Sequence, residues 1–97
     1  MTKCETAICQ LAVNVYGKTS QCTVCMEEMA ELTKELSKSL RGQDNAAHIA
    51  EEIADVEIML EQLKLMFSIR DEVTQQRTVK LQRLDNRISQ SLTHPKP

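Results

Sequence analysis

The chain has 97 residues, of which 41 % are hydrophobic and 2 % aromatic, and its formal net charge is −2 at pH 7. A chain of this length forms one small domain with a modest core, so self-association would help to stabilise it. The near balance of 12 basic and 14 acidic residues argues against a nucleic acid polymer as partner, and no apolar run approaches the roughly 20 residues of a membrane span.

An all-α fold is expected, because the residues that form turns are scarce. Gly and Pro occur twice each, and Pro95 and Pro97 both lie at the end of the chain. Few signals are left to punctuate a sheet, so the interior should consist of packed helices. The N-terminal sequence lacks a secretory pattern, from which we expect a cytoplasmic location and reduced cysteines.

Two helices are expected in the first half of the chain. The first covers about 5–15 and ends near Gly17, because glycine readily adopts the left-handed conformation that terminates helices. The segment 18–21 is expected to be the connection. The second helix covers about 20–40, with its first residue, a serine, as N-cap and Gly42 as its stop signal.

Two further helices are expected in the second half. The turn at 42–45 is short, which makes the third helix, about 46–68, an antiparallel neighbour of the second. The fourth covers about 71–92 and is either continuous with the third or bent away from it. Residues 1–92 are interpreted as a single helical domain, and 93–97 as a disordered tail.

Carboxylates stand where the helical pattern predicts contact between helices. On the third helix, Glu52 and Asp55 belong to a row that is apolar further along, so the pattern predicts their burial. On the second helix, Glu28 and Glu31 run beside an apolar line within 22–40. Residues three apart share a helix face, so each pair can aim two carboxylates at one point between the helices.

Carboxylates gathered in this way need a cation. Two unit charges about 4 Å apart repel by roughly 4 kcal/mol at an effective dielectric constant near 20. A divalent ion relieves this repulsion, and ligands that are all oxygen favour Mg²⁺, with Mn²⁺ as the alternative. The competing interpretation is that the acids are solvated and stabilised by the helix dipoles.

The cysteine pair at Cys22 and Cys25 also permits two interpretations. Its spacing invites a zinc site, which would need two further ligands, and Cys4 and Cys9 are not spaced to supply them. Cys22 and Cys25 also continue the apolar line of the second helix, which indicates buried small hydrophobic residues instead.

The order of these motifs resembles the MazG-like all-α nucleoside triphosphate pyrophosphohydrolases. EEMAE at 27–31 and EIAD at 52–55 are similar to that family's EExxE…ExxD signature, with 20 residues between Glu31 and Glu52. Gly17 and Gln21 upstream match the family's entry to the acidic helix. The resemblance implies a four-helix bundle completed by oligomerisation, as a homodimer or homotetramer. It also implies magnesium-dependent cleavage of a (deoxy)nucleoside triphosphate to the monophosphate and pyrophosphate.

The resemblance also implies roles for individual acids. The residues that correspond to the metal-binding carboxylates are Glu28, Glu31, Glu52 and Asp55. Glu27 corresponds to a group that orients or activates the attacking water, and its alternative interpretation is an exposed glutamate of the first helical turns.

Substrate contacts are expected from both ends of the chain. The candidate residues are Tyr16, Gln21, Lys80, Arg83 and Arg87. The three basic residues form one row on the fourth helix, and cations at this spacing can line one side of a phosphate cleft. The chain departs from the family pattern at Leu84, where relatives often carry Asn. A solvated basic face and a packing role for Tyr16 are the alternatives, and no residue identifies the preferred base.

Two other functions compete with the enzyme. In the first, the chain is a non-catalytic helical interaction module, whose acids provide solubility and whose apolar stripes bind a partner helix. In the second, zinc bound by Cys22 and Cys25 stabilises an adaptor. The outward positions Ile58 and Leu65 lie opposite the main apolar stripe of the third helix, so a second subunit is expected to cover them.

Overall fold

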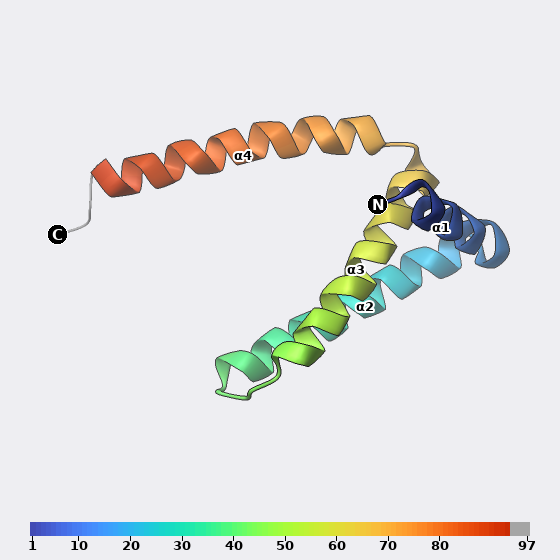
Figure 1. Cartoon of the computed structure of the whole chain (residues 1–97), viewed down its shortest axis with the longest axis horizontal. Helices are drawn as coiled ribbons and strands as arrows, with labels where there is room; N and C mark the ends of the chain where they lie inside the picture. The colour runs from blue at the N-terminus through green and yellow to red at the C-terminus, as the bar shows by residue number, and fades with distance from the viewer. Residues whose placement is uncertain (94–97) are drawn as a thin grey trace.

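The computed structural model describes residues 1–93 of the chain. They form four helices, which are α1 (Lys3–Tyr16), α2 (Lys18–Leu40), α3 (Ala46–Phe67) and α4 (Arg70–Thr93). The expected all-α fold is therefore confirmed. The long helices α2 and α3 lie antiparallel as a hairpin, α1 packs at one end of it, and α4 turns sharply away from that end (Figure 1). In this part of the chain, no helix is both long and apolar enough to cross a membrane.

A single glycine joins α1 to α2. Thr2 and Glu5 form a capping box at the start of α1, in which each side chain accepts a hydrogen bond from the other residue's backbone N–H. At the other end, Gly17 adopts a φ of +90°, a conformation that side chains disfavour. The connection predicted at 18–21 is wrong, because this one residue reverses the chain direction and α2 begins at Lys18. Ser20 lies inside α2 and is not its N-cap.

The expected turn between α2 and α3 is confirmed. Gly42 has a φ of +92° and its N–H donates to the Ser39 carbonyl, at 2.9 Å. Asn45 precedes α3 and is buried, and its side-chain N–H donates to the main-chain carbonyl of Glu35 at 2.9 Å. This bond ties the start of α3 to the last turns of α2.

The third and fourth helices are bent rather than continuous. Ser68 adopts the left-handed conformation (φ 53°, ψ 47°) directly after α3. Beyond it, the Arg70 guanidinium donates to the Glu61 carboxylate, which also accepts a hydrogen bond from the Thr6 hydroxyl at 2.8 Å. These contacts link α1, α3 and the start of α4. The helix α4 includes Thr93, the first residue of the predicted tail, and the rest of that tail lies outside the described residues.

The seam between α2 and α3 follows a heptad spacing. Its buried or half-buried residues include Gln21, Cys25, Glu28, Leu32 and Glu35 from α2, and Asn45, Ile49, Glu52, Val56 and Met59 from α3. Polar side chains at every seventh position of α2 therefore face α3. The apolar lines that the sequence pattern placed at the centre of packing are divided. Cys25, Leu32 and Val56 lie in this seam as expected, whereas Met29, Leu36, Ile53 and Leu60 lie to one side of it and are exposed in the single chain.

Candidate metal centre

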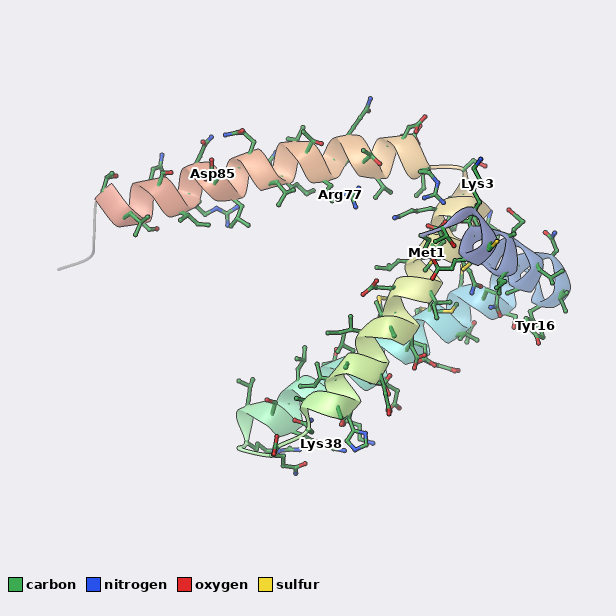
Figure 2. The ribbon with its side chains drawn as sticks, in the orientation of Figure 1. Met1, Lys3, Tyr16, Lys38, Arg77 and Asp85 are labelled. Atoms are coloured by element: carbon green, nitrogen blue, oxygen red, sulfur yellow. The ribbon has the colours of Figure 1, made fainter. Side chains whose placement is uncertain are left out.

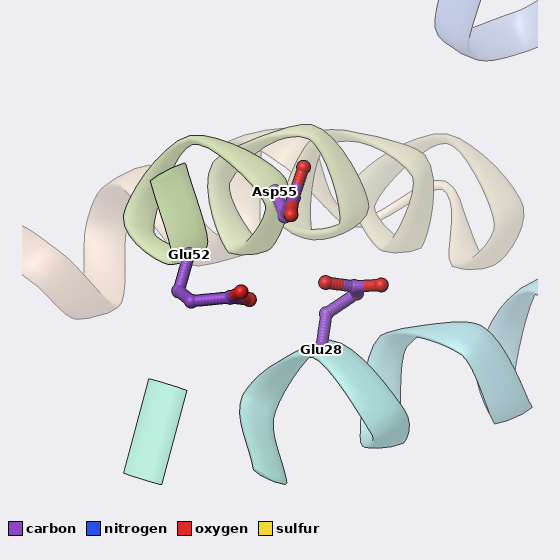
Figure 3. Close-up of side chains that lie close together, drawn as sticks. All are labelled: Glu28, Glu52 and Asp55. Carbon is purple, nitrogen blue, oxygen red and sulfur yellow. The ribbon is translucent and has the colours of Figure 1, made fainter. Parts of the chain in front are cut away.

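Three carboxylates converge between α2 and α3. Glu28 projects from α2, and Glu52 and Asp55 project toward it from successive turns of α3 (Figure 3). One oxygen of each residue lies within 4.8 Å of an oxygen of each of the others. The heptad seam explains the arrangement, because Glu28 and Glu52 both occupy positions that face the opposite helix.

The three acids differ in their exposure. Glu28 and Glu52 are half-buried, whereas Asp55 is exposed at the edge of the seam. The Oε2 atom of Glu52 is buried and has no hydrogen-bond partner among the described residues. A buried polar oxygen without a partner costs free energy, so this atom fits a ligand for a cation or a proton.

The neighbouring acids perturb Glu28. Burial raises the pKa of the Glu28 carboxyl above its ordinary value, and the negative charges and hydrogen bond of Asp55 and the charge of Glu52 raise it further. The charge of Glu31 contributes to the same shift. A metal-free cluster therefore holds a proton more readily than a solvated glutamate does.

The other polar layers of the seam satisfy their own hydrogen bonds. The Gln21 amide donates to Gln62 Oε1 at 2.8 Å, and Asn45 donates to Glu35 as described above. In the acidic layer, by contrast, all three side chains are carboxylates, and none of the ion pairs within residues 1–93 includes them. The donor set consists of hard oxygens, which fits Mg²⁺ or Mn²⁺.

The two remaining acids of the predicted site stay outside the cluster. Glu31 and Glu27 are exposed on α2. At about 100° per residue, both lie on the same side of the hairpin as Asp55, next to the open edge of the cluster. The structure thus brings together three of the four carboxylates expected to hold the metal, and leaves Glu31 beside them.

The two N-terminal substrate candidates have different surroundings. Tyr16 is 66 % exposed at the end of α1 and points into solvent (Figure 2). Gln21 is only 7 % exposed and is held in the seam by its bond to Gln62. Tyr16 is therefore free to contact a ligand, whereas the observed contacts of Gln21 are structural.

The basic row of α4 lies apart from the acids within one chain. Lys80, Arg83 and Arg87 are exposed, and α4 contacts α3 near their junction but makes no contact with α2 among the described residues. The side chains of α4 project into solvent along its length (Figure 2). A single copy therefore does not bring these cations to the carboxylate cluster.

Two of the four cysteines, Cys9 and Cys25, are buried as packing residues. Cys25 is 1 % exposed and Cys9 is 3 % exposed, and burial raises the pKa of both thiols, which disfavours the thiolate that zinc binds. Within residues 1–93, the acidic cluster is the one group of His, Cys, Asp or Glu side chains arranged to hold a metal. Nothing in this arrangement favours the zinc interpretation of Cys22 and Cys25.

A heptad repeat in the sequence distinguishes Glu28, which faces α3, from Glu31, which does not. Gln21, Glu28 and Glu35 recur at every seventh residue and mark the position of α2 that faces α3. Glu31 does not belong to this repeat. The heptad spacing, rather than the three-residue spacing of the acids, separates the buried glutamate from the exposed one.

Comparison of the chain with protein-family models, with curated proteins and with solved structures finds no match.

Proposed function

We propose that this protein is a magnesium-dependent nucleoside triphosphate pyrophosphohydrolase that cleaves a (deoxy)nucleoside triphosphate to the monophosphate and pyrophosphate. The proposal rests on one observation, the convergence of Glu28, Glu52 and Asp55 around a buried oxygen that lacks a partner. The resemblance of the two acidic motifs to MazG-like enzymes agrees with it. The preferred base and sugar are left open.

Glu28, Glu52 and Asp55 would hold Mg²⁺ or Mn²⁺. The bound ion would neutralise triphosphate oxygens and lower the pKa of the attacking water. Asp55 is the exposed member, so its carboxylate faces the side from which the triphosphate would approach. Glu28 has the raised pKa and would give up its proton when the cluster binds a cation.

The exposed acids beside the cluster have a role in the same reaction. Water attacks the α-phosphorus, the bond from this phosphorus to the bridging oxygen breaks, and pyrophosphate leaves with that oxygen. Glu27 lies on the open side of the hairpin, where its carboxylate can orient the water and accept its proton. Glu31 would add negative charge that attracts the cation.

The basic residues of α4 would reach the triphosphate from another copy of the chain. Lys80, Arg83 and Arg87 can pair with phosphate oxygens, but α4 does not contact α2 in its own chain. The proposed enzyme is therefore a homodimer or homotetramer, with Tyr16 as a candidate contact for the base.

The reaction is tested with a panel of ribo- and deoxyribonucleoside triphosphates and Mg²⁺, with chromatographic separation of the products. Monophosphate and pyrophosphate are expected, and Glu52→Gln and Asp55→Asn should each lower the rate by about 100-fold or more. Glu57→Gln, an exposed glutamate of α3 outside the cluster, serves as the control and should keep its activity. Diphosphate and phosphate as products, or equal rates in all variants, would contradict the proposal.

A non-catalytic helical interaction module is the second candidate. The observation that favours it is that α4 has no buried residue, although it carries an apolar stripe. The two candidates differ in their response to metal, because an ion that binds the folded state raises Tm. A Tm that does not change with Mg²⁺ or Mn²⁺, together with a lack of turnover, would favour the module.

A further inference from the structure

A pair of amide side chains lies between α2 and α3, one heptad away from the acidic cluster. Gln21 precedes Glu28 on α2 by seven residues, and Gln62 follows Asp55 on α3 by seven residues. Because α2 and α3 run antiparallel, the two amides occupy the same heptad positions as these two acids do. Seven residues of helix span about 10 Å, which is the distance along the seam between the amides and the acids.

The two amides are buried and bonded to each other. Gln21 is 7 % exposed and Gln62 is 3 % exposed. The Gln21 Nε2 group donates to Gln62 Oε1 at 2.8 Å, and the Gln62 Nε2 group donates to the Met59 sulfur at 3.7 Å. Met59 is itself 5 % exposed. These contacts keep both amides away from any ligand on the surface, so they can act on a ligand only through the helices that they join.

Buried amides determine the alignment of two helices more sharply than apolar side chains do. The apolar contacts of the seam, such as those of Cys25 and Val56, are not directional and tolerate a shift along the helix axis. A buried amide that loses its partner costs free energy, so an alignment that separates Gln21 from Gln62 is disfavoured. Polar residues at seam positions set the register of coiled coils in the same way.

The acidic cluster does not hold its own helices together. Its three members are carboxylates, and when they are ionised their repulsion favours movements that separate α2 from α3. On one side of the cluster, the turn at 42–45 and the bond from Asn45 to Glu35 tie the two helices together. On the other side, the chain leads from α2 to α1 and from α3 to α4. The bond between Gln21 and Gln62 ties α2 to α3 at this end.

We propose that Gln21 and Gln62 are positioning residues of the metal centre. Their hydrogen bond sets the register of α2 against α3 and holds the three carboxylates of the cluster within reach of one cation before the cation binds. A site that is aligned in advance binds its ion more tightly, because less order remains to be created on binding. This inference rests on the metal centre of the proposed function, and its test measures metal binding instead of turnover.

The metal affinity of a variant that keeps its stability tests the proposal. The double substitution Gln21→Met, Gln62→Met removes both amides with little change in volume. It leaves no buried amide without a partner, so Tm in EDTA should not fall. The dissociation constant for Mn²⁺, measured from the electron spin resonance of the free ion, should nevertheless rise by about 10-fold or more. The matched control Gln82→Met, Asn86→Met removes an exposed hydrogen-bonded pair of α4 and should bind Mn²⁺ as the parent does.

Two single variants cover the case in which the double substitution lowers the stability. Gln62→Glu keeps an oxygen that can accept the bond from Gln21, and it should bind Mn²⁺ at least as tightly as the parent. Gln62→Asn keeps an amide but is one methylene too short for this bond, so its affinity should be weaker by about 10-fold.

The outcomes separate this inference from the proposed function. A double variant that binds Mn²⁺ as tightly as the parent would overturn the positioning role and leave the metal centre standing. Equal affinities of Gln62→Glu and Gln62→Asn would have the same meaning. A parent that binds no Mn²⁺ would refute the metal centre and this inference together.

Discussion

The effect of the crowded carboxylates on stability can be measured most directly at Glu28. Because burial and neighbouring acids raise its pKa, the unfolded chain releases this proton at lower pH than the folded chain does. The contribution of Glu28 to stability is therefore fully present below its ordinary pKa of 4.5 and is lost as the pH rises through the folded value. At neutral pH, without a divalent ion, Glu28 destabilises the fold.

Glu28→Gln should raise Tm by a few degrees at pH 7 in the presence of EDTA. The gain should shrink as the pH falls below 4.5, since both proteins then carry a neutral group at this position. Thermal melts of the two proteins across this range measure the difference. Mg²⁺ should raise the Tm of the parent more than that of Glu28→Gln. The control Glu57→Gln should have the same Tm as the parent under each condition. A variant less stable than the parent at pH 7 with EDTA would show that repulsion in the cluster is already relieved.

At the scale of the helices, the ends of α2 and α3 depend on a few polar contacts. Asn45 is 7 % exposed and bonds the carbonyl of Glu35, and its amide also lies 3.4 Å from the Glu35 carboxylate. Lys38 forms an ion pair with the same carboxylate at 3.1 Å. These contacts lower the pKa of Glu35, with the Lys38 hydrogen bond as the main cause, and fix where α3 starts.

Asn45→Ala should destabilise the protein by about 1 kcal/mol, because the hydrogen bonds to Glu35 are lost from a buried position. For a domain of this size, Tm should fall by roughly 4–8 °C. Urea unfolding gives the free energy of unfolding and a melt gives Tm. Asp44→Ala, at the exposed neighbouring position, should change neither value by much. Equal effects of the two substitutions would show that the contact to Glu35 is not what holds the turn.

The helices themselves could be predicted from periodicity and from the two glycines, but their exact starts could not. A serine near 20 is a plausible N-cap in sequence, yet the positive φ of Gly17 allows α2 to begin at Lys18. The bend after α3 was left open because Ser68 carries no sequence signal for its left-handed conformation. The contact that follows the bend, the pairing of Arg70 with Glu61, joins residues on two helices and is not visible in the sequence.

The residues that form the acidic cluster and the core beside it could be predicted only in part. Glu52 and Asp55 were recognisable because they interrupt an apolar row, and they do face Glu28 across the seam. The apolar stripe of α3 was expected to form the core, but only part of it does. Val56 and Leu63 are half-buried, whereas Ile53 and Leu60 are exposed in the single chain. Hydrophobic periodicity indicates that a face is covered and does not indicate whether the cover belongs to the same chain.

At the scale of the whole molecule, contacts within one chain do not explain the exposed apolar stripe and the positive charge of α4. It is an amphipathic helix with no buried residue, and isolated helices of this kind are marginal in water. Residues 73–93 carry four basic residues and one acid, whereas the rest of the described chain is acidic. Both the apolar stripe and the charge of α4 therefore favour contact with another copy.

If the cations of α4 complete the proposed active site, they act between copies, and mixing two defective variants should restore activity. Asp55→Asn removes a carboxylate and leaves α4 intact, whereas the double substitution Arg83→Gln, Arg87→Gln removes cations and leaves the cluster intact. After joint unfolding and refolding, random exchange in a dimer gives about one site in four with both parts unaltered. The mixture should then recover roughly a quarter of the parental rate, measured as pyrophosphate released. If the cations acted within their own chain, every site in the mixture would lack one part, and the rate would stay at the mean of the two variants measured separately.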